Sequence, residues 1–470
     1  MASTTQEQPA EPDHKEWQPP VERSNVRHYP IQKRIRHTTV DRSERSTIEC
    51  RKQCMELTHY CSLTPSVYGS NFARRWQSYC SAMISPPEWL SKPRCIAGAM
   101  SGTSLDGVDA AIVRITQRNE RAHLELLGFA NVAFSREIRS ALEAAIERPI
   151  SIAELSDLAC MLMQVYADAL ARAIADAQQH PEAIGIHGQT LWHAPTPHVR
   201  YGVECRTTFQ LAEPAILAQR FGIPIVSNVR AADVALGGEG APLVPILDWE
   251  LLRSMHEYTI ALNIGGIANI TLLPPGCSRE EITAFDTGPG NVWIDRAMHR
   301  FWGLRYDDRG RTAAAGKPIP ALFEQLTTIP FITAPPPKSA GREIFSAALL
   351  DELLAPFLHP MLPAEDIIAT LTAFTAWSIA ENIRRFGNVN ACIVVSGGGA
   401  KNATLLAMLQ SELPSSRIIH FADRTGIPDT AKEAVLMAYL AYRTLGELPS
   451  NLPSVTGAHK QATLGSITLP

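Results

Sequence analysis

The feature that most constrains this chain is a glycine turn between two β-rich runs, found at residues 97–109 and again at residues 262–270. In each copy a short apolar run leads into the turn and another follows it, which is the pattern of a β-hairpin. Glycine permits a tight turn and a close approach of the backbone to a ligand. Two such hairpins, far apart in one chain, predict two related domains that face one cleft.

The first turn has the chemistry of a phosphate cradle. It contains Gly102 and Gly107 together with three hydroxyl side chains, Ser101, Thr103 and Ser104. It is not a Walker loop, because no Gly-Lys-Ser/Thr sequence follows and the next run has the pattern of a strand. A simple structural hairpin is the alternative interpretation. Asp106 is the candidate to hold Mg²⁺ through water, since a hard cation accompanies a polyphosphate.

A third glycine cluster at residues 397–399 follows a predicted strand and precedes a predicted helix. Such a turn exposes backbone amides at a helix N-terminus or lets the backbone pack against a flat ring. Predicted strands cover residues 95–100, 108–115, 183–186, 225–227, 258–264 and 391–395. Predicted helices cover residues 136–145, 152–179, 214–221, 291–301, 364–386 and 403–413. This alternation favours an α/β architecture.

Composition restricts the classes of function. The chain has 470 residues, of which 45% are hydrophobic, and a net charge of −4, so it lacks the basic excess of a nucleic-acid-binding protein. No apolar run approaches the roughly 18 residues of a membrane span. We therefore expect a cytoplasmic protein with a small-molecule partner, and bound neither to nucleic acid nor to a membrane.

Residues 1–93 lack a sustained apolar period, which predicts a disordered or loosely ordered extension. Four of the nine cysteines lie there, with one histidine among them: Cys50, Cys54, Cys61, Cys80 and His59. Only Cys50 and Cys54 have the spacing of a structural zinc site, so free thiols are the preferred interpretation. The other five cysteines stand in apolar contexts, as in a reduced protein.

Residues 96–467 resemble the anhydro-N-acetylmuramic acid kinases, which share the actin, hexokinase and Hsp70 fold. The resemblance rests on segments in colinear order, at residues 100–109, 185–193, 235–245, 262–269, 285–291, 341–343, 396–402 and 451–458. It implies two actin-like (ribonuclease H-like) domains, at 94–256 and 257–470, with an interdomain ATP cleft and a C-terminal helix that can return to the first domain. It also implies Mg²⁺, an anhydro amino sugar as substrate and a homodimer.

The resemblance further implies site residues. The ATP-binding set is Gly102, Thr103, Ser104, Leu105, Asp106, Gly107, Val108, Asp109, Gly265, Gly266, Gly397, Gly398, Gly399 and Lys401. The sugar-binding set is His187, Gln189, Asp286, Gly288, Asn291 and Glu343. Trp192 can stack on a sugar, although a core position is the favoured interpretation of that residue.

One departure concerns catalysis. The resemblance places the family's basic aspartate in a Ser/Ala-Asp-Phe-Arg stretch, and the matching position here is Asn228. An amide cannot take a proton from water, and general-base assistance is worth about 10²- to 10⁴-fold. Three hypotheses follow: a working sugar kinase in which Asp233 or Glu239 substitutes as base, an ATP- and sugar-binding pseudokinase, or an interaction protein that uses the N-terminal cysteines.

Overall fold

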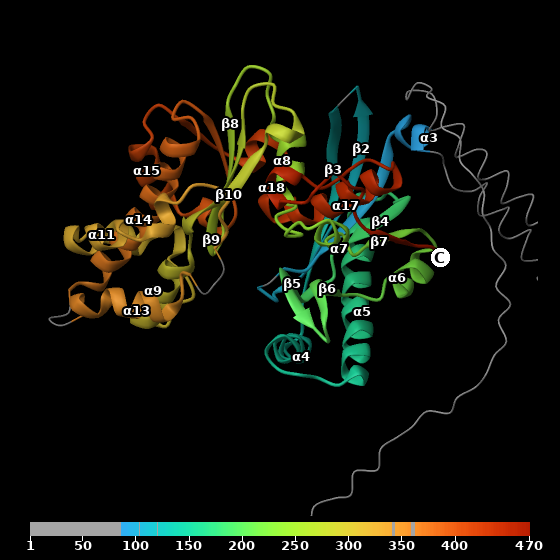
Figure 1. Cartoon of the computed structure of the whole chain (residues 1–470), viewed down its shortest axis with the longest axis horizontal. Coiled ribbons are helices and arrows are strands. Elements are labelled where there is room, and N and C mark those ends of the chain that lie inside the picture. The colour runs from blue at the N-terminus through green and yellow to red at the C-terminus, as the bar shows by residue number, and fades with distance from the viewer. Residues whose placement is uncertain (1–85, 103, 120, 341–343, 359–361) are drawn as a thin grey trace, which may run out of the picture. The chain divides into compact units, whose positions relative to one another are not determined.

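The computed structural model describes residues 86–102, 104–119, 121–340, 344–358 and 362–470 (Figure 1), and these belong to one compact unit. The predicted disorder and the cysteines of residues 1–85 lie outside the described residues. Residues 86–93, which the sequence assigned to the loose extension, are structured. There α3 (Pro86–Leu90) buries Trp89, whose indole Nε1 donates a 3.0 Å hydrogen bond to the carbonyl oxygen of Tyr442. Residues 86–90 are therefore part of the folded unit, contrary to the prediction, because this aromatic side chain anchors them.

The first sheet has the strand order β13-β7-β4-β1-β2-β3, and the second has the order β10-β9-β8-β11-β12. The first contains β1 (Arg94–Met100), β2 (Gly107–Arg118), β3 (Arg121–Ala133), β4 (Ala183–Ile186), β7 (Ile225–Ser227) and β13 (Ser466–Thr468). The second contains β8 (Thr259–Ile264), β9 (Ile267–Leu273), β10 (Thr283–Pro289), β11 (Cys392–Ser396) and β12 (Arg417–His420). In each, three antiparallel strands are followed by two parallel ones.

This repeated topology is the actin-like, ribonuclease H-like arrangement, and it confirms the predicted fold class. The two glycine hairpins occupy equivalent positions, because β1–β2 opens the first sheet and β8–β9 opens the second. A separate two-stranded sheet pairs β5 (Gln189–Arg200) with β6 (Val203–Leu211). The sequence did not predict β3 or this β5–β6 hairpin. Trp192 lies on β5 and is 60% exposed, so the favoured core position for it was wrong.

Helices cover both faces of the first sheet. α5 (Ile152–Ala177) packs on β2 and β3, and α17 (Lys432–Leu445) packs on β1, β2 and β4. Alternate residues of β2 serve the two faces: Ile112 belongs to the core under α5, and Val113 to the core under α17. The C-terminal helix thus lies on the first sheet (Figure 1).

Two glycines allow α17 to approach the strands closely. A β-carbon at Gly98 would overlap the carbonyl oxygen of Ala434, and one at Gly185 would overlap that of Met437. Among the described helices, α5 alone has the length and composition to cross a membrane, with a mean hydropathy of 1.4. Its buried side chains, including Leu162, Tyr166 and Leu170, belong to the core of the first sheet, as expected for an internal helix.

The remaining helices frame the sheets. They are α4 (Arg136–Glu147), α6 (Pro214–Phe221), α7 (Ala231–Ala235), α8 (Val244–Leu252), α9 (Val292–Trp302), α10 (Arg311–Ala315), α11 (Pro320–Thr327), α12 (Pro330–Thr333), α13 (Ala347–Leu354), α14 (Ala364–Phe386), α15 (Ala403–Glu412), α16 (Phe421–Thr425) and α18 (Pro453–Thr456). Short 3-10 turns lead into three helices: η2 (Asp308–Gly310) into α10, η4 (Gly398–Lys401) into α15 and η5 (Asp429–Ala431) into α17. α14 and α15 pack together beside the second sheet.

Candidate active site

The β1–β2 turn is held by backbone contacts. Leu105, buried and with a φ of 53°, donates its amide to the carbonyl of Gly102. Gly107 is a packing residue, since a β-carbon there would overlap the carbonyl oxygen of Val132 on β3. A β-carbon at Gly102 would meet nothing closer than 3.9 Å, so this part of the turn is open to a ligand. Thr103 lies outside the described residues.

The acidic residues of this turn differ in environment. Asp106 is exposed and pairs with Arg139 at 3.0 Å. Asp109 is half-buried and accepts a 2.8 Å hydrogen bond from Asn131. Burial raises the pKa of Asp109, an effect that the Asn131 hydrogen bond opposes. Of the two, Asp109 therefore has the environment of a site carboxylate, whereas Asp106 resembles a surface ion-pair partner.

Three turns of the second sheet meet at one place. The carbonyl of Gly265 accepts the amide of Asn291, and that of Gly266 accepts the amide of Gly290. The Asn291 side chain adds hydrogen bonds to the carbonyls of Ile264 (3.2 Å) and Gly265 (3.0 Å). The β8–β9 turn is therefore fixed against the start of α9.

The triple glycine packs on the same turn. Gly397 has a φ of 85°, and a β-carbon there would lie 2.8 Å from the carbonyl oxygen of Ile264. A β-carbon at Gly399 would overlap the side chain of Ile264. By contrast, a β-carbon at Gly266 would meet nothing within 4 Å, and Lys401 is exposed at the end of η4. The glycines thus serve two purposes: some allow close packing, and Gly266 leaves open space.

The start of α17 connects the first and third glycine motifs. Lys432 forms a buried ion pair with Asp248 at 2.7 Å, and its Nζ lies 3.5 Å from the hydroxyl of Ser396, where β11 ends. The adjacent Glu433 faces Gly102, and its pKa is raised by burial and by Asp109 and lowered by Arg230. Sequence reasoning missed Glu433, because its place in the site depends on how α17 packs.

His187 and Gln189 follow β4, as predicted. The buried His187 donates from Nδ1 to the carbonyl of Gly188 (2.9 Å), and its Nε2 accepts from Nε of Arg230 (2.8 Å). Burial and Arg230 lower the pKa of His187 to about 3. Burial also lowers the pKa of Arg230 to about 10. His187 is therefore neutral at physiological pH, and Arg230 is a further site residue that the sequence analysis did not select.

Gln189 is 1% exposed, and its Oε1 accepts a hydrogen bond from Ser101 of the β1–β2 turn. Its Nε2 has no hydrogen-bond partner among the described residues. Because buried donors are nearly always paired, an unpaired amide here is consistent with a polar ligand group. On β5, Trp192 donates from Nε1 to the hydroxyl of Thr207 (3.1 Å), which fixes its exposed ring.

Asp286 lies on β10, four residues before Gly290, where the chain contacts the β8–β9 hairpin. Its Oδ2 accepts hydrogen bonds from the amide of Ala340 (2.7 Å) and the hydroxyl of Ser339 (3.4 Å). None of the described residues donates to Oδ1. Burial raises the pKa of this carboxyl, an effect that the two hydrogen bonds and Lys338 oppose. Gly288 forms a bulge in β10 with a φ of 154°, packed against Ile332. Glu343 lies outside the described residues.

The three residues predicted to carry base catalysis lie in different surroundings. Asn228 follows β7, is exposed and has a φ of 55°. Asp233 is fully buried. Its Oδ1 accepts from Asn451 and Thr456, and its Oδ2 accepts from the amide of Gly240, all at 2.8 Å. Glu239 is exposed near His193. The geometry therefore gives Asp233 a structural function, as the link between α7 and the C-terminal segment.

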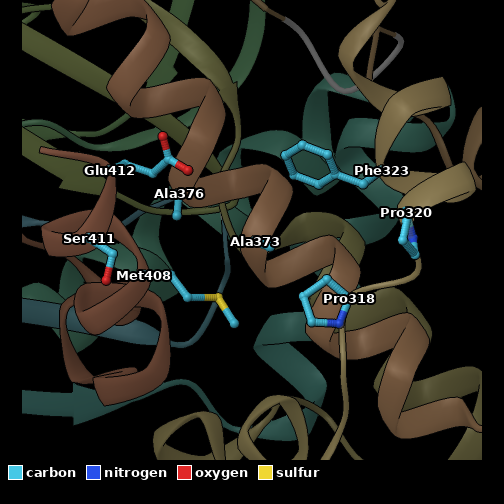
Figure 2. Close-up of a pocket in the computed structure, with 8 residues that line it drawn as sticks. All are labelled: Pro318, Pro320, Phe323, Ala373, Ala376, Met408, Ser411 and Glu412. Atoms are coloured by element: carbon cyan, nitrogen blue, oxygen red, sulfur yellow. The ribbon is translucent and has the colours of Figure 1, made fainter.

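A pocket of about 360 Å³ lies elsewhere, between α14, α15 and the segment that leads into α11 (Figure 2). Its lining is mostly apolar: Pro318, Pro320, Phe323, Ala373, Ala376, Met408, Ser411 and Glu412. None of the predicted site residues lines it. Glu412 is already paired with Arg384. Among the described residues, no group of three or more His, Cys, Asp or Glu side chains is placed to hold a metal ion.

The duplicated sheets, with glycine turns at their strand ends, have the topology of the actin-like fold, and the family match makes the chain an ATP-dependent sugar kinase with that fold. Residues 94–470 match the family model described as anhydro-N-acetylmuramic acid kinase. The chain belongs to this family, and the resemblance inferred from the motifs is confirmed. The pseudokinase alternative is not favoured.

Several relatives carry the family name. The one from Salinibacter ruber is 38% identical over 384 residues, which cover 80% of this chain and 96% of the relative. The one from Caldanaerobacter subterraneus is 38% identical over 386 residues, which cover 80% of this chain and 97% of the relative. Among solved structures, the activator of the 2-hydroxyisocaproyl-CoA dehydratase from Clostridium difficile aligns with 75% of this chain and 96% of its own, at 10% identity and a TM-score of 0.39. That likeness is too distant for a functional comparison.

Proposed function

We propose that this chain phosphorylates 1,6-anhydro-N-acetylmuramate, or a closely related anhydro amino sugar, at the 6-oxygen while water opens the anhydro bridge. The observation that carries the proposal is Asp286. This carboxylate is held through one oxygen and has no described donor at the other, and it lies on β10, the strand that leads to the turn in contact with the β8–β9 hairpin. A half-buried carboxyl with a raised pKa is a better base than an ordinary one.

Asp286 accounts for base catalysis better than the three residues selected from the sequence. Asn228 has no basic atom. The oxygens of Asp233 are occupied by three donors, and the side chain is closed to solvent. Glu239 is exposed beside His193, and its amide donates to the carbonyl of Thr456 in the C-terminal segment. We therefore assign proton abstraction to Asp286, and give Asp233 a structural role.

The proposed reaction proceeds as follows. Asp286 takes a proton from a water molecule, whose oxygen forms a bond to C1 of the sugar while the C1–O6 bond breaks. The freed O6 forms a bond to the γ-phosphorus of ATP, and the bond from that phosphorus to the bridging oxygen breaks, which releases ADP. The proton on Asp286 then passes to solvent. Gln189 is proposed to bind a sugar hydroxyl through its unpaired Nε2. The neutral His187, whose two ring nitrogens are occupied by Gly188 and Arg230, is proposed to hold Arg230 in place.

The open glycines fit ATP. At Gly102 and Gly266 the absence of a side chain leaves room for phosphate oxygens to approach the backbone. Mg²⁺ also fits, and when bound it would neutralise charge on the phosphates. We propose that Asp109 and Glu433 hold it, with water and phosphate oxygens as the other ligands, because both face the first turn. The original candidate, Asp106, is exposed and paired with Arg139.

The same proposal includes the domains 94–256 and 257–470 with ATP between them, a homodimer and a cytoplasmic location. The packing of α17 on the first sheet, and the 3.5 Å contact between Nζ of Lys432 and the hydroxyl of Ser396 at the end of β11, support a C-terminal helix that connects the two domains. Light scattering on the purified protein tests the dimer. A single-subunit mass would exclude it.

The catalytic proposal is tested with labelled ATP and 1,6-anhydro-N-acetylmuramate, alongside N-acetylmuramate, whose 6-hydroxyl is already free. We expect wild type to phosphorylate the anhydro sugar. Asp286→Asn should lower kcat by about 10²- to 10⁴-fold while retaining ATP binding. Glu239→Gln is the matched control and should remain active. Full activity in Asp286→Asn would exclude Asp286 as the base, and no transfer by wild type to any anhydro or amino sugar would exclude the function.

A further inference from the structure

Lys338 is held at an unusual site close to Asp286. Its Nζ donates hydrogen bonds to two carbonyls in the last turn of α12, those of Phe331 (3.0 Å) and Ile332 (2.9 Å). The ammonium also lies over three aromatic rings, at 5.0 Å from the ring centre of Phe331, 5.7 Å from Phe285 and 5.8 Å from Phe386. A cation is stabilised by the faces of such rings. The side chain is therefore fixed on several sides although it is only half-buried.

The backbone around Lys338 holds Asp286. The carbonyl of Lys338 accepts the amide of Asp286 at 3.2 Å. The next two residues, Ser339 and Ala340, donate to Oδ2 of Asp286. Residues 338–340 therefore contact Asp286 through its backbone and its carboxylate at once, and the Lys338 side chain ties this short segment to α12.

α12 in turn is packed against the strand that carries Asp286. Ile332 of α12 lies against the bulge at Gly288, where a β-carbon would come within 2.9 Å of it. Phe285, which precedes Asp286, stacks edge-on against Phe386 of α14. The cation thus sits among the strand, α12 and α14, the three elements whose relative position sets where the Asp286 carboxylate points.

We propose that Lys338 is a positioning residue for this reaction, which holds residues 338–340 against β10 and so sets the orientation and basicity of Asp286. This inference rests on the proposed role of Asp286 as the base. Lys338 acts in two ways. It fixes the segment that donates to Oδ2, and its positive charge favours the ionised carboxylate.

The charges around the pair support this assignment. Burial lowers the pKa of Lys338 to about 8, while Asp286 raises it and Arg385 on α14 lowers it. Arg385 is itself paired with Glu381 at 2.6 Å. Near neutral pH, Lys338 is therefore mostly charged, and its positive charge lowers the pKa of Asp286, against the effect of burial.

The test compares Lys338→Met with Lys338→Arg in the full chain. Methionine keeps an apolar stem between the rings but has no charge and no hydrogen-bond donor, whereas arginine keeps the positive charge and the donors. We expect Lys338→Met to lower kcat by about 10- to 100-fold with little change in the KM for ATP. Removal of the positive charge raises the pKa of Asp286, so the acid limb of the kcat–pH profile should move to higher pH by roughly half a unit or more. Lys338→Arg should recover most of both properties.

Several outcomes would overturn the proposal. An acid limb in Lys338→Met that coincides with that of wild type would reduce Lys338 to a structural residue, even if kcat fell. A Lys338→Arg variant as impaired as Lys338→Met would show that the positive charge does not account for the effect of Lys338. If Lys338→Met does not fold, Lys338→Gln is measured by the same criteria.

A double mutant separates this proposal from the role of Asp286. If Lys338 acts through Asp286, Asp286→Asn/Lys338→Met should be no slower than Asp286→Asn alone. If the loss of kcat in the double mutant equals the product of the losses in the two single variants, the positioning role is overturned while Asp286 remains the base. If Asp286→Asn alone is fully active, the base assignment fails first, and the positioning role with it.

Discussion

The guanidinium of Arg230 donates a 2.8 Å hydrogen bond from Nε to Nε2 of His187. Because Nδ1 of the same ring donates to the carbonyl of Gly188, the imidazole is fixed as one neutral tautomer. Arg230 also donates to the carbonyl of Gly240 at 2.7 Å. One cation therefore ties the residues after β4 to the loop after α7, and this tie requires an uncharged histidine.

The stability of the protein should depend on the neutral state of His187. Its pKa is about 3 in the folded chain and 6.5 as an ordinary group, so between these values the unfolded chain binds a proton that the folded chain refuses. The stabilisation is complete above pH 6.5 and falls by about 1.4 kcal/mol per pH unit below it. The advantage of wild type over His187→Gln, measured by urea denaturation, should shrink by about 2 kcal/mol from pH 7 to pH 5. A constant gap would contradict this assignment.

The proposed role of Asp233 is structural. Asp233→Asn puts an amide group where three donors meet, so it should lower the free energy of unfolding by about 2–4 kcal/mol. Glu239→Gln, at an exposed position, should change it by less than about 0.5 kcal/mol. The folded fraction of Asp233→Asn should keep kcat within a few-fold of wild type. A loss of 10²-fold or more in folded protein would make Asp233 a candidate base again.

Much of the fold could be predicted from local pattern. Helix α6 and strands β4 and β7 have the predicted bounds, and the two hairpins that begin the sheets follow from glycine between apolar runs. Strand β3 carries a usable sequence signal, since buried Ala122 and Leu124 alternate with exposed His123 and Glu125. The β5–β6 hairpin has a weaker sequence signal, because most of its side chains are exposed and no apolar face marks its two segments as strands.

The site was harder to predict, for a physical reason. Motifs identify residues that are neighbours in the chain, and so they selected the glycine turns, His187 and Asp286 as candidates. Arg230, Glu433 and Lys338 act through tertiary contacts, with partners far away in sequence or on other elements. No local period or spacing marks such residues. The same limitation affects Asn228, whose match to a motif gave no information about its exposure.

The glycines of the two hairpins should respond differently to substitution. Gly266→Ala adds a methyl group to open space, so stability should stay within about 0.5 kcal/mol. If phosphate approaches this backbone, the KM for ATP should rise about tenfold. The control Gly98→Ala drives a β-carbon into the backbone of α17 and should cost at least about 3 kcal/mol. Thermal unfolding and ATP titration distinguish the two effects. An unchanged KM in Gly266→Ala would remove Gly266 from the ATP site.

Asn228→Asp tests whether the departure at this position matters for catalysis. The side chain is exposed, and its backbone has a φ of 55°, a conformation that asparagine and aspartate both tolerate. If Asp286 is the base, a carboxylate at position 228 adds nothing to proton abstraction. We expect kcat for the anhydro sugar to change by less than about threefold, a small fraction of the 10²- to 10⁴-fold that a general base supplies.

The informative comparison makes the Asn228→Asp change in both backgrounds, wild type and Asp286→Asn. A gain of 10²-fold or more from Asn228→Asp in the wild-type background would mean that the natural chain lacks its base, and would favour the pseudokinase hypothesis. A rescue confined to the Asp286→Asn background would instead show that position 228 can reach the attacking water when Asp286 cannot act. Asn228 is exposed and follows a strand of the first sheet, whereas Asp286 lies on a strand of the second sheet. Since the two positions belong to different sheets, we expect neither result.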